Sequence, residues 1–184
     1  MKHLIFVFAL INSIITMAQS EEKLPYYEIP EYSESYTANS VAARMIDGLG
    51  FRYYWATEGL LTEDLNYKPS ESARATSETI EHIYGLSKVI RNNVLTDNKD
   101  DNKEKLNFEG LRKQTLLNLK LVSDALRSTK APFKLEDSAV PFWNIINGPI
   151  SDALWHCGQV VLLRRSSGNH FNSKVNLFSG KIKE

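Results

Sequence analysis

The sequence contains a single cysteine, and this scarcity excludes a disulfide-stabilised fold. Cys157 is the only thiol in the chain of 184 residues, so an internal disulfide cannot form and the fold must depend on its hydrophobic core. The chain also has no net charge, because its 22 basic residues equal its 22 acidic residues in number. Without a strongly basic surface, nucleic acid is not an expected partner.

Several sequence patterns with a known chemical role are absent as well. The chain has no Gly-rich phosphate-binding loop, no CxxC pair and no Ser/His/Asp arrangement for nucleophilic catalysis. It also lacks internal repeats, low-complexity tracts and the alternating apolar and polar runs that indicate strands. Any catalytic function must therefore come from a site that the fold assembles from separate helices.

Long apolar runs are scarce, and the one that stands out is N-terminal. Residues 4–17 are apolar except at three positions, follow Lys2 and His3, and precede Ala18. A basic start, a short apolar run and small residues at a cleavage point are typical of a secretory signal peptide. The alternative is an uncleaved anchor, but a spanning helix needs roughly 20 apolar residues. We therefore expect residues 1–18 to be removed and the protein to be periplasmic or secreted, without stable membrane insertion.

The remaining chain shows helical spacing in four stretches. Residues 19–35, with two prolines and many charges, are expected to form an extended lead-in outside the core. Beyond them, apolar residues recur at three- and four-residue steps in the regions of 36–60, 76–94, 108–126 and 149–167. The sequence predicts one all-α domain over 36–184, and a four-helix bundle is its simplest architecture.

Local signals refine these helices. Gly48 and Gly50 lower the helix propensity of the first, and we expect them to be tolerated because a neighbouring helix approaches closely there. Thr76 or Ser77 is the expected cap of the second helix. Pro149 is expected at the first position of the fourth helix, where its missing N–H costs nothing.

The fourth predicted helix carries an unusual polar stripe. Asp152, His156 and Gln159 are spaced four and three residues apart and so lie on one side of the helix. The residues around them are almost all apolar, and a helix that is apolar on all sides is usually buried. Buried polar groups must be paired or must coordinate an ion, so this stripe requires a partner.

His82 in the second helix offers a partner for this stripe. Helical bundles build metal sites from side chains that project inward from facing helices. His82, Asp152 and His156 would form a two-histidine, one-carboxylate set, which suits a divalent ion such as Zn, Fe, Mn or Ni and leaves coordination positions open. The alternative is an ion pair between Asp152 and His156 one turn apart, with His82 as an ordinary core histidine.

The order of these motifs resembles that of the DinB/YfiT-like helical bundle family. The matching pieces are YWATEGLLT at 54–62, EHI at 81–83 and DALWHCGQV at 152–160, followed by arginines and a glycine at 164–168. The resemblance implies a four-helix bundle that holds a divalent metal through one ligand of the second helix and two of the fourth. These positions fall on His82, Asp152 and His156. The family usually has three histidines, so Asp152 is a departure that leaves the metal identity open.

The resemblance also bears on function. Some members of the family are thiol-dependent transferases or isomerases, but their thiols are cytosolic, which argues against that chemistry for an exported protein. We expect a metal-dependent enzyme, hydrolase- or transferase-like, that acts on a small-molecule substrate. The alternative is a non-catalytic helical module that binds a ligand or partner, with a structural metal or none. Bundles of this kind often pair, so a homodimer is an expected state.

The other polar or reactive residues near these motifs have simpler expected roles. Gln159 is expected to support the ligands, and Cys157, which points about 100° away from His156 around the helix, to be a small buried hydrophobe. Glu78 is expected to be a first-turn acid that complements the helix dipole. Tyr54 and Trp55 are expected to pack in the core, and Arg164 and Arg165 to complement the dipole at the end of the fourth helix.

Overall fold

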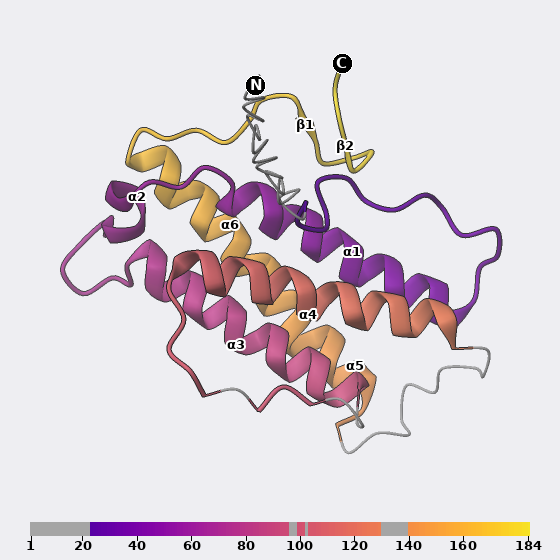
Figure 1. The fold of residues 1–184 in the computed structure, drawn as a ribbon. Coiled ribbons are helices and arrows are strands. Elements are labelled where there is room, and N and C mark those ends of the chain that lie inside the picture. Colours follow the sequence, from indigo (N-terminus) through magenta and orange to yellow (C-terminus); the bar gives the residue numbers. More distant parts are fainter. Residues whose placement is uncertain (1–22, 96–98, 102, 130–139) are drawn as a thin grey trace, which may run out of the picture.

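The computed structural model describes residues 23–95, 99–101, 103–129 and 140–184, so the predicted signal peptide lies outside the described residues. The described chain is mainly helical, which confirms the all-α prediction (Figure 1). Its helices, in order, are α1 (Ala38–Thr57), α2 (Thr62–Asn66), α3 (Thr76–Val94), α4 (Phe108–Ser128), α5 (Phe142–Ile145), the π-helical turn η1 (Ile146–Ile150) and α6 (Ser151–Ser166). None of these described helices combines the length and the apolar composition needed to cross a membrane.

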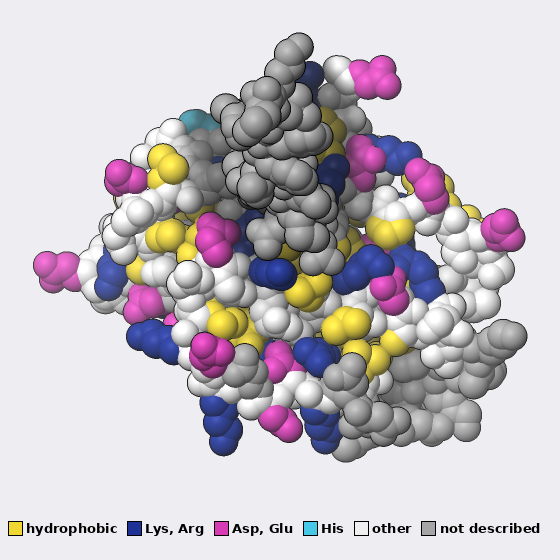
Figure 2. Space-filling model, in the orientation of Figure 1, with side chains coloured by type: hydrophobic (Ala, Val, Ile, Leu, Met, Phe, Trp, Pro, Cys, Tyr) yellow, Lys and Arg dark blue, Asp and Glu magenta, His cyan; other side chains and the backbone are white. Residues whose placement is uncertain are grey.

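The four long helices pack around a common core. α1 contacts α4 and α6, and α3 contacts the same two helices from the other side, so each long helix has two long neighbours. The core side chains between them are apolar and almost fully buried, and they include Ile46, Phe51, Tyr53, Ile80, Ile83, Ile90, Leu116, Leu119, Val122, Ala153 and Val160. On the face drawn in Figure 2, Lys and Arg side chains are interspersed with Asp and Glu.

Side-chain caps explain where the first helices begin. The Thr37 hydroxyl accepts a hydrogen bond from the Ser40 N–H at 3.1 Å at the start of α1. The prediction that Thr76 or Ser77 caps the second helix was wrong, because α3 begins at Thr76 and its N-cap is Ala75. The Glu78 carboxylate accepts a hydrogen bond from the Ala75 N–H at 2.6 Å. The Glu78 side chain thus pairs the backbone N–H of the N-cap residue, although Ala75 has no side-chain oxygen with which to cap the helix itself.

The fourth predicted helix begins earlier than the sequence indicated. Helical structure starts at Phe142, and Pro149 lies inside the π-helical turn η1 rather than at the first position of a helix. The wider turn accommodates a proline, because the ring lacks an N–H and would clash with a carbonyl in a regular α-helix. The Ser151 hydroxyl donates to the Ile146 carbonyl at 2.6 Å and so satisfies one displaced acceptor. The predicted end is confirmed, since Gly168 follows α6 with a φ of 96°.

The lead-in and the tail hold each other against the helices. The strands β1 (Val175–Asn176) and β2 (Lys181–Ile182) form an antiparallel pair in which Val175 faces Ile182. The Ile29 N–H donates to the Gly180 carbonyl at 2.9 Å, which joins the lead-in to this hairpin. The expectation that the lead-in stays outside the core was wrong, because Tyr26 is only 4% exposed. A single buried residue in an extended segment gives no periodic signal from which such burial could be inferred.

Tyr26 also explains why a glycine stands at position 50, where the sequence had predicted the close approach of a neighbouring helix. A Cβ at Gly50 would lie less than 3.0 Å from three carbons of the Tyr26 ring, whereas one at Gly48 would meet only the Arg52 guanidinium at 3.5 Å. The close approach at Gly50 is therefore made by a side chain of the lead-in. At Gly48 no close approach requires a glycine.

We predict opposite effects of alanine at the two glycines. Gly50→Ala should lower the free energy of unfolding by about 1–3 kcal/mol, because the added methyl overpacks against Tyr26. Gly48→Ala, the matched control in the same helix, should raise it by about 0.5–1 kcal/mol through better helix propensity. Urea denaturation measures both values. Equal stabilisation by the two substitutions would show that Tyr26 does not pack on Gly50.

Candidate metal centre

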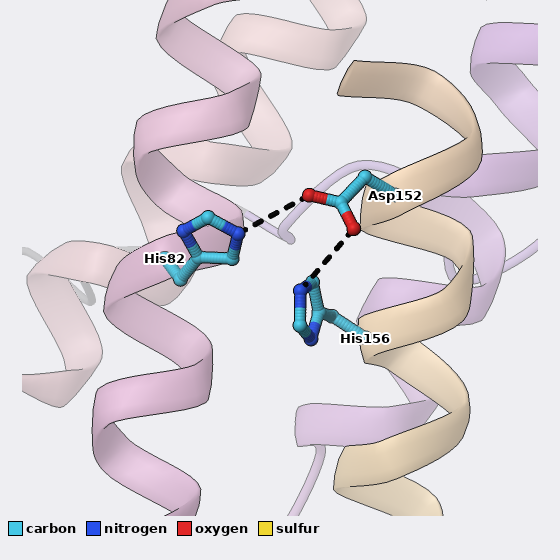
Figure 3. Close-up of side chains that lie close together, drawn as sticks. All are labelled: His82, Asp152 and His156. Atoms are coloured by element: carbon cyan, nitrogen blue, oxygen red, sulfur yellow. Dashed lines mark hydrogen bonds and ion pairs between the residues drawn. The ribbon is translucent and has the colours of Figure 1, made fainter. Parts of the chain in front are cut away.

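Three predicted ligands meet between α3 and α6 (Figure 3). His82 projects from α3, and Asp152 and His156 project one turn apart from α6. The Asp152 carboxylate lies between the two imidazoles: His82 Nε2 is 3.2 Å from Oδ2, and His156 Nε2 is 3.3 Å from Oδ1. The rings are nearly perpendicular, with centroids 4.6 Å apart. The three residues offer donor atoms that all lie within 4.8 Å of one another, and this group could hold a metal ion.

The spacing of the donors fits a coordinated ion. Ligand atoms around a tetrahedral zinc, at bond lengths of roughly 2.0–2.2 Å, are separated by about 3.3–3.6 Å. The two nitrogen–oxygen distances in this group, 3.2 and 3.3 Å, are close to that separation; they run to different oxygens of Asp152 and are also the distances of hydrogen-bonded ion pairs. The donor types fit as well, because imidazole and carboxylate suit Zn, Fe and Mn. Small side-chain movements would therefore suffice to close the three donors on an ion.

Gln159 orients one of the imidazoles. Its Oε1 lies 2.7 Å from His156 Nδ1. An amide oxygen only accepts, so in this contact the proton lies on Nδ1, and Nε2 is the ring nitrogen that faces Asp152 Oδ1 and could serve as the metal ligand. Metal-bound histidines commonly have such a partner on the second ring nitrogen. The expectation that Gln159 supports the ligands, rather than joining them, agrees with this geometry.

The group is more exposed than the sequence suggested. The side chains of His82 and Asp152 are 37% and 42% exposed, and that of His156 is 13% exposed. α6 is not buried on all sides, since Trp155 and Leu162 are 74% and 63% exposed. The argument that burial forces Asp152 to find a partner was therefore wrong. Solvent can reach the group, and a bound ion could keep open positions.

A cleft adjoins the group on the His156 side. It has a volume of about 410 Å³, and we name it the metal cleft; its lining residues are Pro69, Ala73, Arg74, Thr79, His156, Gln159, Leu162 and Leu163. A volume of this size is typical of small-molecule sites, which span roughly 300–1,000 Å³. Sequence reasoning missed Arg74, the cation of this cleft. It lies in the connection between α2 and α3, and no sequence pattern links that connection to α6.

The other candidate residues have structural roles. Cys157 is 3% exposed, and burial raises the pKa of its thiol to about 12, which nearby Arg52 only partly opposes. It is therefore a protonated, buried thiol, as predicted. Glu78 acts in the first turn of α3, as described above. Trp55 and Tyr54 are buried, and the Trp55 indole donates to the Tyr27 carbonyl at 3.1 Å. The prediction that they serve packing rather than line a pocket was wrong for Trp55, which also lines a cavity.

Arg164 does more than complement its own helix. It is 2% exposed, and its guanidinium donates to the Trp55 and Ala56 carbonyls of α1 at 3.1 and 3.0 Å. It also donates to the Asn169 carbonyl beyond the end of α6 at 2.9 Å. Arg164 thus caps the C-terminal end of α1 and fixes the first residues of the tail beyond α6, which the dipole interpretation did not anticipate. Arg165, in contrast, is exposed and lies over the Phe171 ring.

Comparison of the chain with protein-family models, curated proteins and solved structures gives no match.

Proposed function

We propose that this chain is an exported, metal-dependent enzyme built on a four-helix bundle of the DinB/YfiT-like kind. The proposed chemistry is hydrolase- or transferase-like, on a small molecule. The observation that carries the proposal is the His82, Asp152 and His156 group, whose donor spacing suits a divalent ion and which is partly open to solvent. Structural metal sites fill their coordination sphere with protein groups, whereas catalytic sites keep a position open.

The side chains of the metal cleft have distinct proposed roles. Gln159 fixes the ring of His156, and Leu162 and Leu163 provide an apolar wall on which a substrate can lie. Arg74 places a positive charge in the same cleft, where it would hold an anionic group of the substrate. A bound divalent ion would supply Lewis acidity, activating water or polarising a substrate oxygen.

A non-catalytic binding module is the second candidate function. The observation that favours it is the pair of exposed apolar side chains Trp155 and Leu162, seven residues apart on α6. Residues at this spacing lie on one side of a helix. They would form the centre of a contact with a partner or with a second copy of the chain, and the metal would then be structural or absent.

An activity screen separates the two candidates. The protein is purified from the exported fraction of its host, where its N-terminus should read from Gln19. It is loaded in turn with Zn, Fe(II) and Mn and offered aryl esters, aryl phosphates, and chlorodinitrobenzene with added thiol. We expect metal-dependent turnover of at least one probe, abolished in the Asp152→Asn variant. Turnover that Asp152→Asn leaves unchanged would contradict the enzyme proposal, and a blank screen with a captured partner would favour the binding module.

A further inference from the structure

A second cavity lies between α1, α6 and the C-terminal tail. We name it the α1–α6 cavity. It has a volume of about 320 Å³, at the lower end of the range of small-molecule sites. Its apolar lining comes from three parts of the chain and consists mainly of Trp55, Ala56, Leu154, Val161, Phe171 and Leu177.

The α1–α6 cavity is separate from the metal cleft. The two share no lining residue. Cys157 lines the cavity, while its neighbour His156 lines the cleft, and adjacent residues of a helix point about 100° apart. A ligand of the cavity would therefore contact none of the three candidate metal ligands.

Gly158 helps to keep the α1–α6 cavity open. A glycine inside an α-helix costs about 1 kcal/mol relative to alanine, so its presence in α6 calls for an explanation. Close approach of another element is not the reason, since a Cβ at this position would meet no atom within 4 Å. Gly158 lines the cavity, so a larger side chain at this position can extend into its space.

Two arginines give the cavity its charge preference. Arg52 and Arg165 are both among its lining residues, and no carboxylate is. Neither guanidinium forms an ion pair with any carboxylate of the described residues. The Arg52 guanidinium donates to the Gly48 carbonyl at 3.0 Å, and the Arg165 guanidinium lies over the Phe171 ring. The cavity thus combines an apolar wall with two cations that lack a counter-charge.

We propose that the α1–α6 cavity binds a small amphiphilic carboxylate, whose apolar body lies against Trp55 and Phe171 and whose anionic group pairs with Arg52 or Arg165. The apolar wall provides burial for a short chain or ring. A guanidinium can hold a carboxylate through two parallel hydrogen bonds. An apolar wall beside two cations without a carboxylate partner favours an anionic amphiphile over neutral lipids and over cations.

Isothermal titration calorimetry with two probes, octanoate and phenylbutyrate, tests the proposal. We expect at least one to bind, and the neutral octanol and the cationic octyltrimethylammonium ion, which also carry eight-carbon chains, to bind at least tenfold more weakly. Gly158→Leu should weaken binding at least tenfold while keeping or raising the melting temperature. Its matched control is Gly85→Leu, also at a helical glycine with open space around its Cβ, and should leave affinity unchanged. Gly158→Ala should retain binding, which shows that the position tolerates a side chain.

The charge component has its own control. Arg52→Gln or Arg165→Gln should weaken octanoate binding about tenfold, whereas Lys113→Gln, the same charge change at an exposed site of α4, should not. The proposal is overturned if neither carboxylate binds or if Gly158→Leu binds as tightly as the wild type. Octanol binding as tightly as octanoate, or both arginine variants at wild-type affinity, would equally overturn the assigned ligand class.

Discussion

The His156→Ala variant is expected to lose detectable binding of divalent metal. His156 is the least exposed of the three candidate ligands, and Gln159 holds its ring in place. Loss of a direct ligand should exceed the roughly 10–100-fold reduction in affinity caused by removing a supporting residue. Asp152→Asn should weaken binding less, because a neutral amide is a poorer ligand than a carboxylate. Metal titration of the apo-protein, with the ion content measured after dialysis, gives both values.

The control for this prediction is His170→Ala, at an exposed histidine of the tail, which should bind metal as the wild type does. Chelator should lower the melting temperature of the wild type, because a ligand that binds only the native state stabilises it by mass action, and should leave His156→Ala unchanged. The ion-pair interpretation predicts otherwise. Under it, Asp152→Asn lowers the melting temperature equally with and without chelator, and no metal co-purifies.

Arg164→Ala is expected to be the most destabilising single substitution considered for this chain. The guanidinium is the shared donor for the Trp55 and Ala56 carbonyls and lies near the buried Asp64 carboxylate, which opposes the lowering of the Arg164 pKa by burial. Its removal leaves the two buried carbonyls of α1 without this donor, at a cost of about 1–3 kcal/mol each. Urea unfolding followed by far-UV circular dichroism measures this loss.

Arg165→Ala is the matched control, since the adjacent arginine is exposed and surface substitutions usually change stability by less than about 0.5 kcal/mol. Arg164→Lys separates charge from geometry. A lysine keeps the charge but cannot donate in several directions from a planar group, so we expect it to recover only part of the stability. Full recovery by lysine, or equal effects at 164 and 165, would contradict the capping role.

Sequence reasoning found the helices because their apolar spacing is a local property. Sequence reasoning also predicted that His82, Asp152 and His156 lie together. A carboxylate and a histidine one turn apart are rare in an apolar helix, and so is a single histidine in a second such helix. Whether the ion binds stays a prediction. The same reasoning misjudged the exposure of α6, since an apolar residue such as Trp155 looks the same in the sequence whether or not another element covers it.

The misses share a physical cause. Three features depend on contacts between segments far apart in the chain: the burial of Tyr26, the position of Arg74 beside His156, and the cap that Arg164 provides for α1. Composition and periodicity describe one segment at a time, so they carry no information on such contacts. The π-helical turn was missed for a local reason, because proline is compatible both with the first turn of a helix and with a widened one.

That widened turn sets the rotational phase of the last helix. Along α5, η1 and α6 the buried apolar positions are Phe142, Ile145, Ile150, Ala153, Cys157, Val160 and Leu163. Their steps are three or four residues, as in an α-helix, except for the five-residue step across η1. The π-helical turn accommodates one extra residue, so the segments on both sides face the same core while the helix continues without interruption. The turn therefore holds one residue more than a regular α-helical turn. Removing that residue would rotate α6 about its axis and change the direction in which Asp152 and His156 point.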